Sequence, residues 1–87
     1  MTVKKEVKKK ARAIRNTIKG LTLPQSVKMA KLYLKGDRVA VLNLIYHFGY
    51  TVTFSTVTDD DGVTYGTATI SKGNFSVTVP YTDGIVL

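Results

Sequence analysis

Apolar residues repeat with a helical period in the first half of the chain and with a period of two in the second half. The helical pattern predicts three helices, over residues 3–19, 23–35 and 38–48. The alternating pattern predicts three strands, over residues 50–58, 63–71 and 75–79. Short turns between consecutive strands favour antiparallel pairing. The pattern therefore predicts an α+β fold in which three N-terminal helices pack on a three-stranded antiparallel β-meander.

The first helix, with Thr2 as its cap and Gly20 as its stop, is predicted to be amphipathic. Its apolar residues step by three and four positions and form a narrow seam: Val7, Ala11, Ile14, Ile18 and Leu21. A seam of this kind also suits a homodimer formed through Val7, Ala11, Ile14 and Ile18. Because the seam is narrow and the helix is strongly charged, residues 1–20 are predicted to be dispensable for folding.

Clear end signals bracket a helical hairpin over residues 21–49. Thr22 and Gln25 have the spacing of a capping box. Gly36 is suited to end the first of these helices, and Asp37 is suited to cap the next. The predicted buried face of the second helix consists of Leu23, Val27, Ala30 and Leu34, with Met29 and Tyr33 beside it.

Residues 38–48 are apolar on nearly all sides, so this segment is predicted to be the central, buried helix. A buried strand is the alternative for such a run. A helix is favoured because Asp37 and Gly49 bracket eleven residues, which is longer than the usual strand.

Turn residues divide the second half of the chain, residues 50–80. Residues 59–62, three aspartates and a glycine, are predicted to form the first turn, and Gly73 marks the second. Pro80 is predicted to end the third strand. The apolar tail, residues 81–87, is expected either to fold back as a short edge strand or to dock on a partner.

Length and composition limit the chemistry of the protein. Eighty-seven residues form one domain, residues 1–87, and the lack of cysteine excludes disulfides and thiolate sites. His47 is the only histidine and is expected to be structural, at the core or its boundary, while Asp59, Asp60 and Asp61 lack the further ligands of a calcium loop. No nucleophile-elbow, phosphate-loop or paired-carboxylate pattern occurs, so we expect no enzymatic activity and no cofactor. The sequence has no apolar run long enough for a membrane span, and a cytoplasmic location is expected.

Charge is distributed unevenly along the chain. Residues 1–38 contain twelve Lys or Arg against two acids, a net charge of +10, whereas residues 39–87 contain one lysine against four aspartates, a net charge of −3. A field of this shape attracts polyanions to one end of the protein. The cations of the first helix exceed what solubility needs and oppose its stability, although a purely solubilising surface is the alternative.

These charges predict a nucleic-acid interface on the first two helices. The predicted binding residues are Lys5, Lys8, Lys9, Arg12, Arg15, Lys19, Lys28, Lys31, Lys35 and Arg38. Helices that read base edges expose polar side chains, but residues 39–48 are the most apolar in the chain, so contacts to phosphates with little sequence preference are expected. Two other functions remain open: an accessory protein of the phage type that binds an acidic host protein, and a homo-oligomeric assembly protein.

Overall fold

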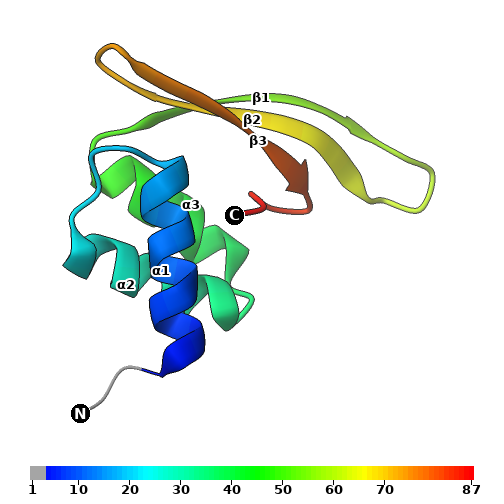
Figure 1. Cartoon of the computed structure of the whole chain (residues 1–87). Coiled ribbons are helices and arrows are strands. Elements are labelled where there is room, and N and C mark those ends of the chain that lie inside the picture. Colours follow the sequence, from blue (N-terminus) through cyan, green and yellow to red (C-terminus); the bar gives the residue numbers. More distant parts are fainter. Residues whose placement is uncertain (1–3) are drawn as a thin grey trace.

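The computed structural model describes residues 4–87 and places three helices on one side of a three-stranded sheet (Figure 1). The elements are α1 (Lys5–Thr17), α2 (Leu23–Leu34), α3 (Arg38–His47), β1 (Thr51–Thr58), β2 (Thr64–Lys72) and β3 (Phe75–Thr82). The strand order is β1-β2-β3, and both strand pairs are antiparallel. The predicted α+β fold, with helices before a β-meander, is confirmed.

α1 has no side-chain cap at its first turn. The predicted start at residue 3, with Thr2 as the cap, lies outside the described residues. The helix ends at Thr17, two residues before the predicted end, because Ile18 has left the helical conformation with φ −104° and ψ 92°. Gly20 then adopts a φ of 97°, which turns the chain towards α2.

The predicted caps of the helical hairpin are confirmed. The Thr22 amide donates to Gln25 Oε1 at 2.9 Å, and the Gln25 amide donates to Thr22 Oγ1 at 3.3 Å, which completes the capping box. Asp37 Oδ1 accepts from the Ala40 amide at 3.1 Å and caps α3. These bonds satisfy backbone donors at the two helix starts and fix where α2 and α3 begin.

The buried face of α2 differs from the predicted one. Leu23 and Leu34 are 52% and 47% exposed, whereas Ser26, Met29 and Ala30 are buried. Ser26 can lie in the core because its hydroxyl donates to the Thr22 carbonyl at 2.9 Å. The side of α2 that faces the core is therefore rotated from the predicted one and includes Ser26. The prediction missed this residue because it considered only apolar side chains.

α3 is a helix, as favoured from the sequence, but it is not the central one. Val41, Leu44 and Ile45 are buried, whereas Val39 is 70% exposed and Tyr46 is also exposed. One side of α3 packs on α2 and β1, and the other side faces solvent. An apolar composition on all sides therefore did not correspond to burial on all sides.

α1 supplies much of the core instead. Val7, Ala11, Ile14 and Ile18 are all buried and belong to the same cluster as the sheet residue Ile70. The seam is therefore part of the main core, contrary to the prediction that residues 1–20 are dispensable. The same burial corrects the predicted homodimer, because side chains enclosed within one molecule cannot meet those of a second copy.

β3 continues through Pro80 to Thr82, beyond the predicted end at residue 79. Pro80 pairs with Thr67, and its carbonyl accepts from the Val86 amide at 2.9 Å on the side away from β2. The backbone N and O of one residue point to the same side of an antiparallel strand, so the missing N–H of Pro80 removes no bond to β2. Proline is therefore tolerated inside this edge strand.

The two faces of the sheet have different surroundings. Ala68, Ile70 and Val79 are buried on the face that covers the helices. The opposite face is rich in hydroxyl groups, and Thr69 Oγ1 and Thr78 Oγ1 lie 3.0 Å apart across β2 and β3. The end of the sheet at the β1–β2 turn projects beyond the helices (Figure 1), where residues 53–62 are exposed.

Tyr50 joins the end of α1 to the start of the sheet. Its ring is buried, and its hydroxyl donates to the Lys19 carbonyl at 2.8 Å. Lys72 Nζ lies 4.9 Å from the centroid of the ring and donates to the Phe48 carbonyl at 3.0 Å. Burial raises the pKa of the Tyr50 phenol above its ordinary value of 10.0.

We expect Tyr50→Phe to lower the free energy of unfolding by about 1 kcal/mol near neutral pH, because the Lys19 carbonyl loses its donor. The contribution of the hydroxyl is complete below pH 10, where Tyr50 keeps its proton in both the folded and the unfolded state. It is lost as pH rises through the raised pKa of the folded state, since the unfolded chain ionises first. The difference in the free energy of unfolding between the wild-type protein and Tyr50→Phe should therefore become smaller above pH 10.

Urea unfolding of both proteins at neutral pH and above pH 10 measures this difference. An equal difference at both pH values would contradict a stabilising role for the protonated Tyr50 hydroxyl.

Candidate nucleic-acid interface

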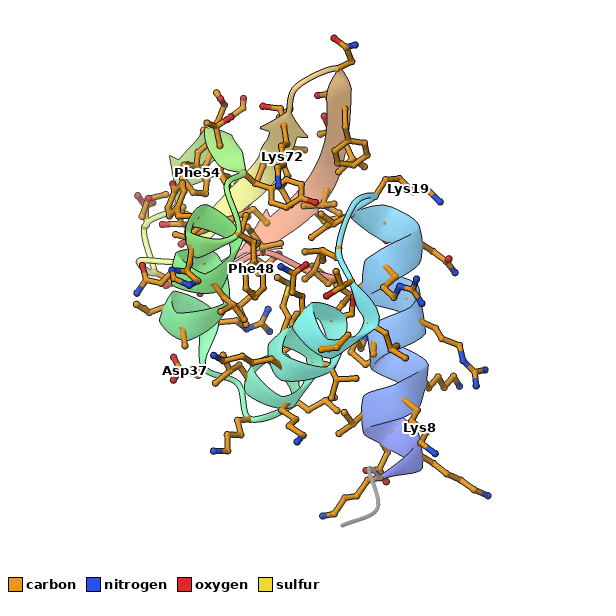
Figure 2. The ribbon with its side chains drawn as sticks, turned by 90° about the vertical axis from the view of Figure 1, so that its left-hand side faces the viewer. Lys8, Lys19, Asp37, Phe48, Phe54 and Lys72 are labelled. Atoms are coloured by element: carbon orange, nitrogen blue, oxygen red, sulfur yellow. The ribbon has the colours of Figure 1, made fainter. Side chains whose placement is uncertain are left out.

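The outer side of α1 carries most of the predicted site. The cations that it exposes are Lys5, Lys8, Lys9, Arg12 and Arg15, and Lys19 follows in the turn after the helix. Lys8 and Lys19 lie near opposite ends of the helix, and their side chains point away from the other two helices (Figure 2). Because the seam of α1 faces the core, these cations are held on the solvent side. The structure thus gathers six of the ten predicted residues on one surface.

An open depression lies where α1 ends. It has a volume of about 390 Å³ and is lined by Arg12, Arg15, Asn16, Lys19, Gly20 and Leu21. Two guanidinium groups and an ammonium group offer only donors, and planar guanidinium groups match the oxygens of a phosphate. The depression therefore has the charge and the donor chemistry of an anion site.

A groove between α1 and α2 adjoins this depression. It has a volume of about 360 Å³, and Lys8, Ala11, Arg12, Leu23 and Val27 line it. Arg12 lines both hollows, so they adjoin at this side chain. The exposed Leu23 therefore forms an apolar wall beside two cations, an arrangement that the predicted buried face of α2 did not anticipate.

The lysines of α2 form a separate group. Lys28, Lys31 and Lys35 are exposed, on the side of α2 opposite the buried Met29. None of the three lines the depression at the end of α1. The structure therefore does not bring these predicted residues together with those of α1 at that depression.

Lys28 instead borders a shallow hollow on α3, of about 450 Å³, together with Ala40, Asn43, Leu44 and His47. His47 is exposed there, although it was expected at the core or its boundary. The ring of His47 lies 5.8 Å from that of Phe48, centroid to centroid, in a tilted arrangement. The hollow is wide and open, and a lone histidine beside one lysine indicates no particular chemistry.

Arg38 contacts the tail and does not line the depression at the end of α1. Its Nη1 donates to the Ile85 carbonyl at 3.0 Å, and its guanidinium group lies 5.1 Å from the centroid of the Tyr33 ring. The side chain therefore holds the tail in place, and a role of Arg38 in binding nucleic acid stays a prediction. Sequence reasoning missed the contact with the tail because the partner carbonyl lies 47 residues further along the chain.

The tail docks on the helices of its own chain. Lys10 Nζ donates to the Leu87 carbonyl at 2.8 Å, and the Leu87 amide donates to the Tyr33 hydroxyl at 3.1 Å. Ile85 is buried and forms an isolated bridge with Tyr81, so the predicted return as a short edge element is partly realised. Lys10 and Arg38 both lie over the Tyr33 ring and are engaged within the molecule.

The acidic turn confirms its prediction. Asp59 Oδ1 accepts from the Asp61 amide at 2.9 Å and from the Val63 amide at 3.0 Å. Over residues 4–87, no group of three or more histidine, cysteine or acidic side chains is arranged to hold a metal ion. The Asp59 carboxylate thus holds the backbone of the turn.

No helix within the described part of the chain has both the length and the apolar content needed to cross a membrane. Comparisons of the chain with protein-family models, with curated proteins and with solved structures find no match.

Proposed function

We propose that the protein is a small non-enzymatic binding module that holds nucleic acid on the outer face of α1. The observation that carries this proposal is the depression lined by Arg12, Arg15 and Lys19, set within a longer run of exposed cations. Donors of this type bind phosphate oxygens and do not by themselves distinguish one base from another. Binding should therefore depend on phosphates and show little sequence preference.

The placement of charge along α1 supports a ligand with several phosphates. Glu6 is the only acid in the helix, and cations in the first turn oppose the helix dipole. Like charges three and four residues apart also repel one another, so the bare helix carries an electrostatic cost. A polyanion laid along α1 relieves this cost, which favours a nucleic acid over a single small anion.

We expect micromolar binding to duplex DNA and RNA of random sequence, measured by fluorescence anisotropy over a series of salt concentrations. If about five phosphates are neutralised, the log–log slope against salt should be about −4 to −5. Arg12→Gln/Arg15→Gln should make the slope shallower by about 2, because two phosphate contacts are removed. Circular dichroism should remain unchanged, since both side chains are exposed.

The matched control is Thr67→Glu/Ser76→Glu, which changes the net charge by the same amount on the sheet face opposite the helices. Both positions are exposed, and each points away from the buried face that contains Ile70. If the control weakens binding as much as the arginine variant does, the interaction reflects net charge and not the α1 face. Binding that does not respond to salt would overturn the proposal.

The groove between α1 and α2 favours a second candidate, an acidic protein partner. Leu23 and Val27 give this groove an apolar wall, and Lys8 and Arg12 give it a cationic rim. Protein interfaces combine such apolar contact with peripheral charge, and an accessory protein of the phage type would use it against an acidic host protein. Salt separates the candidates, because an apolar contact persists at salt concentrations that abolish contacts to phosphates alone.

A further inference from the structure

β1 leaves one of its two sides unpaired. Within the described residues it pairs only with β2, and it forms one edge of the sheet. Seven of its eight residues are exposed, and Val52 is half-buried. An edge strand of this length presents a row of backbone donors and acceptors to any strand that can align with it.

The outward groups of β1 can be identified from the pairing. The backbone carbonyl of Pro80 faces away from β2, so Pro80 and Thr67 are a pair without hydrogen bonds between them. Thr67 therefore directs its own N–H and C=O groups towards Ser55 of β1. Hydrogen-bonded positions alternate along the strand. The residues of β1 that direct their N–H and C=O groups outward are therefore Val52, Phe54, Thr56 and Thr58.

The two edges of the sheet are protected very differently. β3 contains Pro80, and the Val86 amide and the Tyr81–Ile85 bridge cover part of its outer side. β1 contains no proline, glycine, lysine or other charged residue between Thr51 and Thr58. Charged side chains and proline are the usual means by which edge strands avoid pairing with other chains. The free edge therefore lacks the features that would exclude a partner strand.

We propose that β1 pairs antiparallel with β1 of a second copy, forming a two-fold symmetric dimer with a continuous six-stranded sheet. A self-complementary patch is what two-fold symmetry requires, and an uncharged strand paired with itself brings no like charges together. In the register with the longest overlap, Phe54 lies opposite Thr56 of the second copy, Val52 lies opposite its Thr58, and about eight backbone hydrogen bonds form.

Exposed apolar side chains near the edge support this arrangement. Phe54 is 41% exposed and lies on the helix-facing side of the sheet, where its ring meets Tyr81 edge to face at 5.5 Å. Val57 is 59% exposed on the opposite side of the sheet. In the proposed register each copy covers the other's Val57 with its own Thr53, and the two Phe54 rings become diagonal neighbours.

The charge of the molecule lies away from this edge. α3 contacts β1, whereas α1, which carries Lys8 and Lys19, lies on the side of the molecule opposite Phe54 of β1 (Figure 2), so the cationic helix is away from the dimer axis. The only Lys or Arg of α3 is Arg38, which is already bound to the tail. The two-fold axis stands perpendicular to the sheet, so both copies of α1 lie on the same face at its two ends. Dimerisation is thus compatible with the high net charge.

The test is sedimentation equilibrium of the full chain without nucleic acid, in about 0.5 M salt so that long-range repulsion is screened. We expect a mass that rises with concentration towards twice the 9.6 kDa of the chain. Thr53→Lys/Val57→Lys should keep the protein monomeric, because each new charge would face another across the axis. The matched control Thr67→Lys/Ser76→Lys adds the same charge away from the edge and should leave the dimer intact.

A charge-swap experiment keeps the outcome unambiguous. Thr53→Lys/Val57→Lys mixed with Thr53→Glu/Val57→Glu should restore a dimer that contains one chain of each kind, whereas each variant alone stays monomeric. Circular dichroism of each variant confirms that it is folded. A wild-type chain that is monomeric at all concentrations overturns the proposal, as does a dimer that survives the edge substitutions. An edge that pairs only with an extended peptide from another protein would also overturn it.

Discussion

Removal of residues 1–20 is expected to unfold the protein, and this is the largest effect that the structure predicts. The deletion takes away Ala11, Ile14 and Ile18, all fully buried, and exposes the core residues that they cover. It also removes the Lys19 carbonyl that accepts from the Tyr50 hydroxyl. A domain of this size has a small free energy of unfolding, so losing the core contacts of α1 should leave the folded state unstable.

Circular dichroism and amide-proton chemical-shift dispersion of a chain that begins at Leu21 measure the result. Point variants show whether packing is the cause: Ile14→Ala should lower the free energy of unfolding by about 2 to 5 kcal/mol. Leu23→Ala, a similar truncation at a half-exposed position, should cost less than about 1 kcal/mol. A folded chain from Leu21 would show that α2, α3 and the sheet form a core without α1.

Gly66→Ala is expected to have the second-largest effect, roughly 2 to 4 kcal/mol of unfolding free energy. Gly66 has a φ of 149°, which favours glycine, and an added Cβ would collide with the Ser55 carbonyl and crowd Thr56. Both neighbours are backbone groups of β1, so the strand itself must move. The β1–β2 pair should therefore loosen over its projecting half, visible as faster amide exchange.

Gly62→Ala is the matched control for this substitution. Gly62 also has a positive φ, of 83°, but an added Cβ meets no atom within 4 Å. Its replacement should cost about 1 kcal/mol, the conformational strain alone. Equal effects at the two glycines in urea unfolding would show that the close approach of Ser55 is not what requires Gly66.

The sequence predicted what depends on local chemistry. The Thr22 capping box, the Asp37 cap and the Asp59 turn each form from groups within four residues of one another. Such local contacts can be recognised from short sequence motifs. The order of helices and strands was predicted from the same helix caps and turn residues. For this reason most element bounds agree with the structure to within one or two residues.

The sequence did not predict which faces are buried, because that depends on how the elements meet. Val39 is apolar but exposed, because no other element covers it. Ser26 is polar but buried, because its hydroxyl donates to a backbone carbonyl. The narrow seam is central because α2 packs along it and its residues share one core cluster with the sheet residue Ile70. Hydrophobic content gives the amount of apolar surface but not the neighbours that cover it.

The candidate site was predictable to a similar degree. The α1 cations were expected to be exposed and are exposed, since charged side chains without buried partners remain in water. Arg38 has the same chemistry, but its side chain is bound by a carbonyl that the fold brings from the tail. The depression beside Arg12 and Lys19 also depends on the path of the chain at Gly20, which charge counting does not reveal.

The docking of the tail also has a consequence for how the molecule forms. The Lys10–Leu87 hydrogen bond closes a loop of 77 residues, and contacts so distant in sequence are costly to form early in folding. During synthesis at about 10 residues per second, Lys10 emerges roughly eight seconds before Leu87. Through that interval Lys10, Tyr33 and Arg38 lack their tail partners, so these native contacts form only after residues 85–87 have been synthesised.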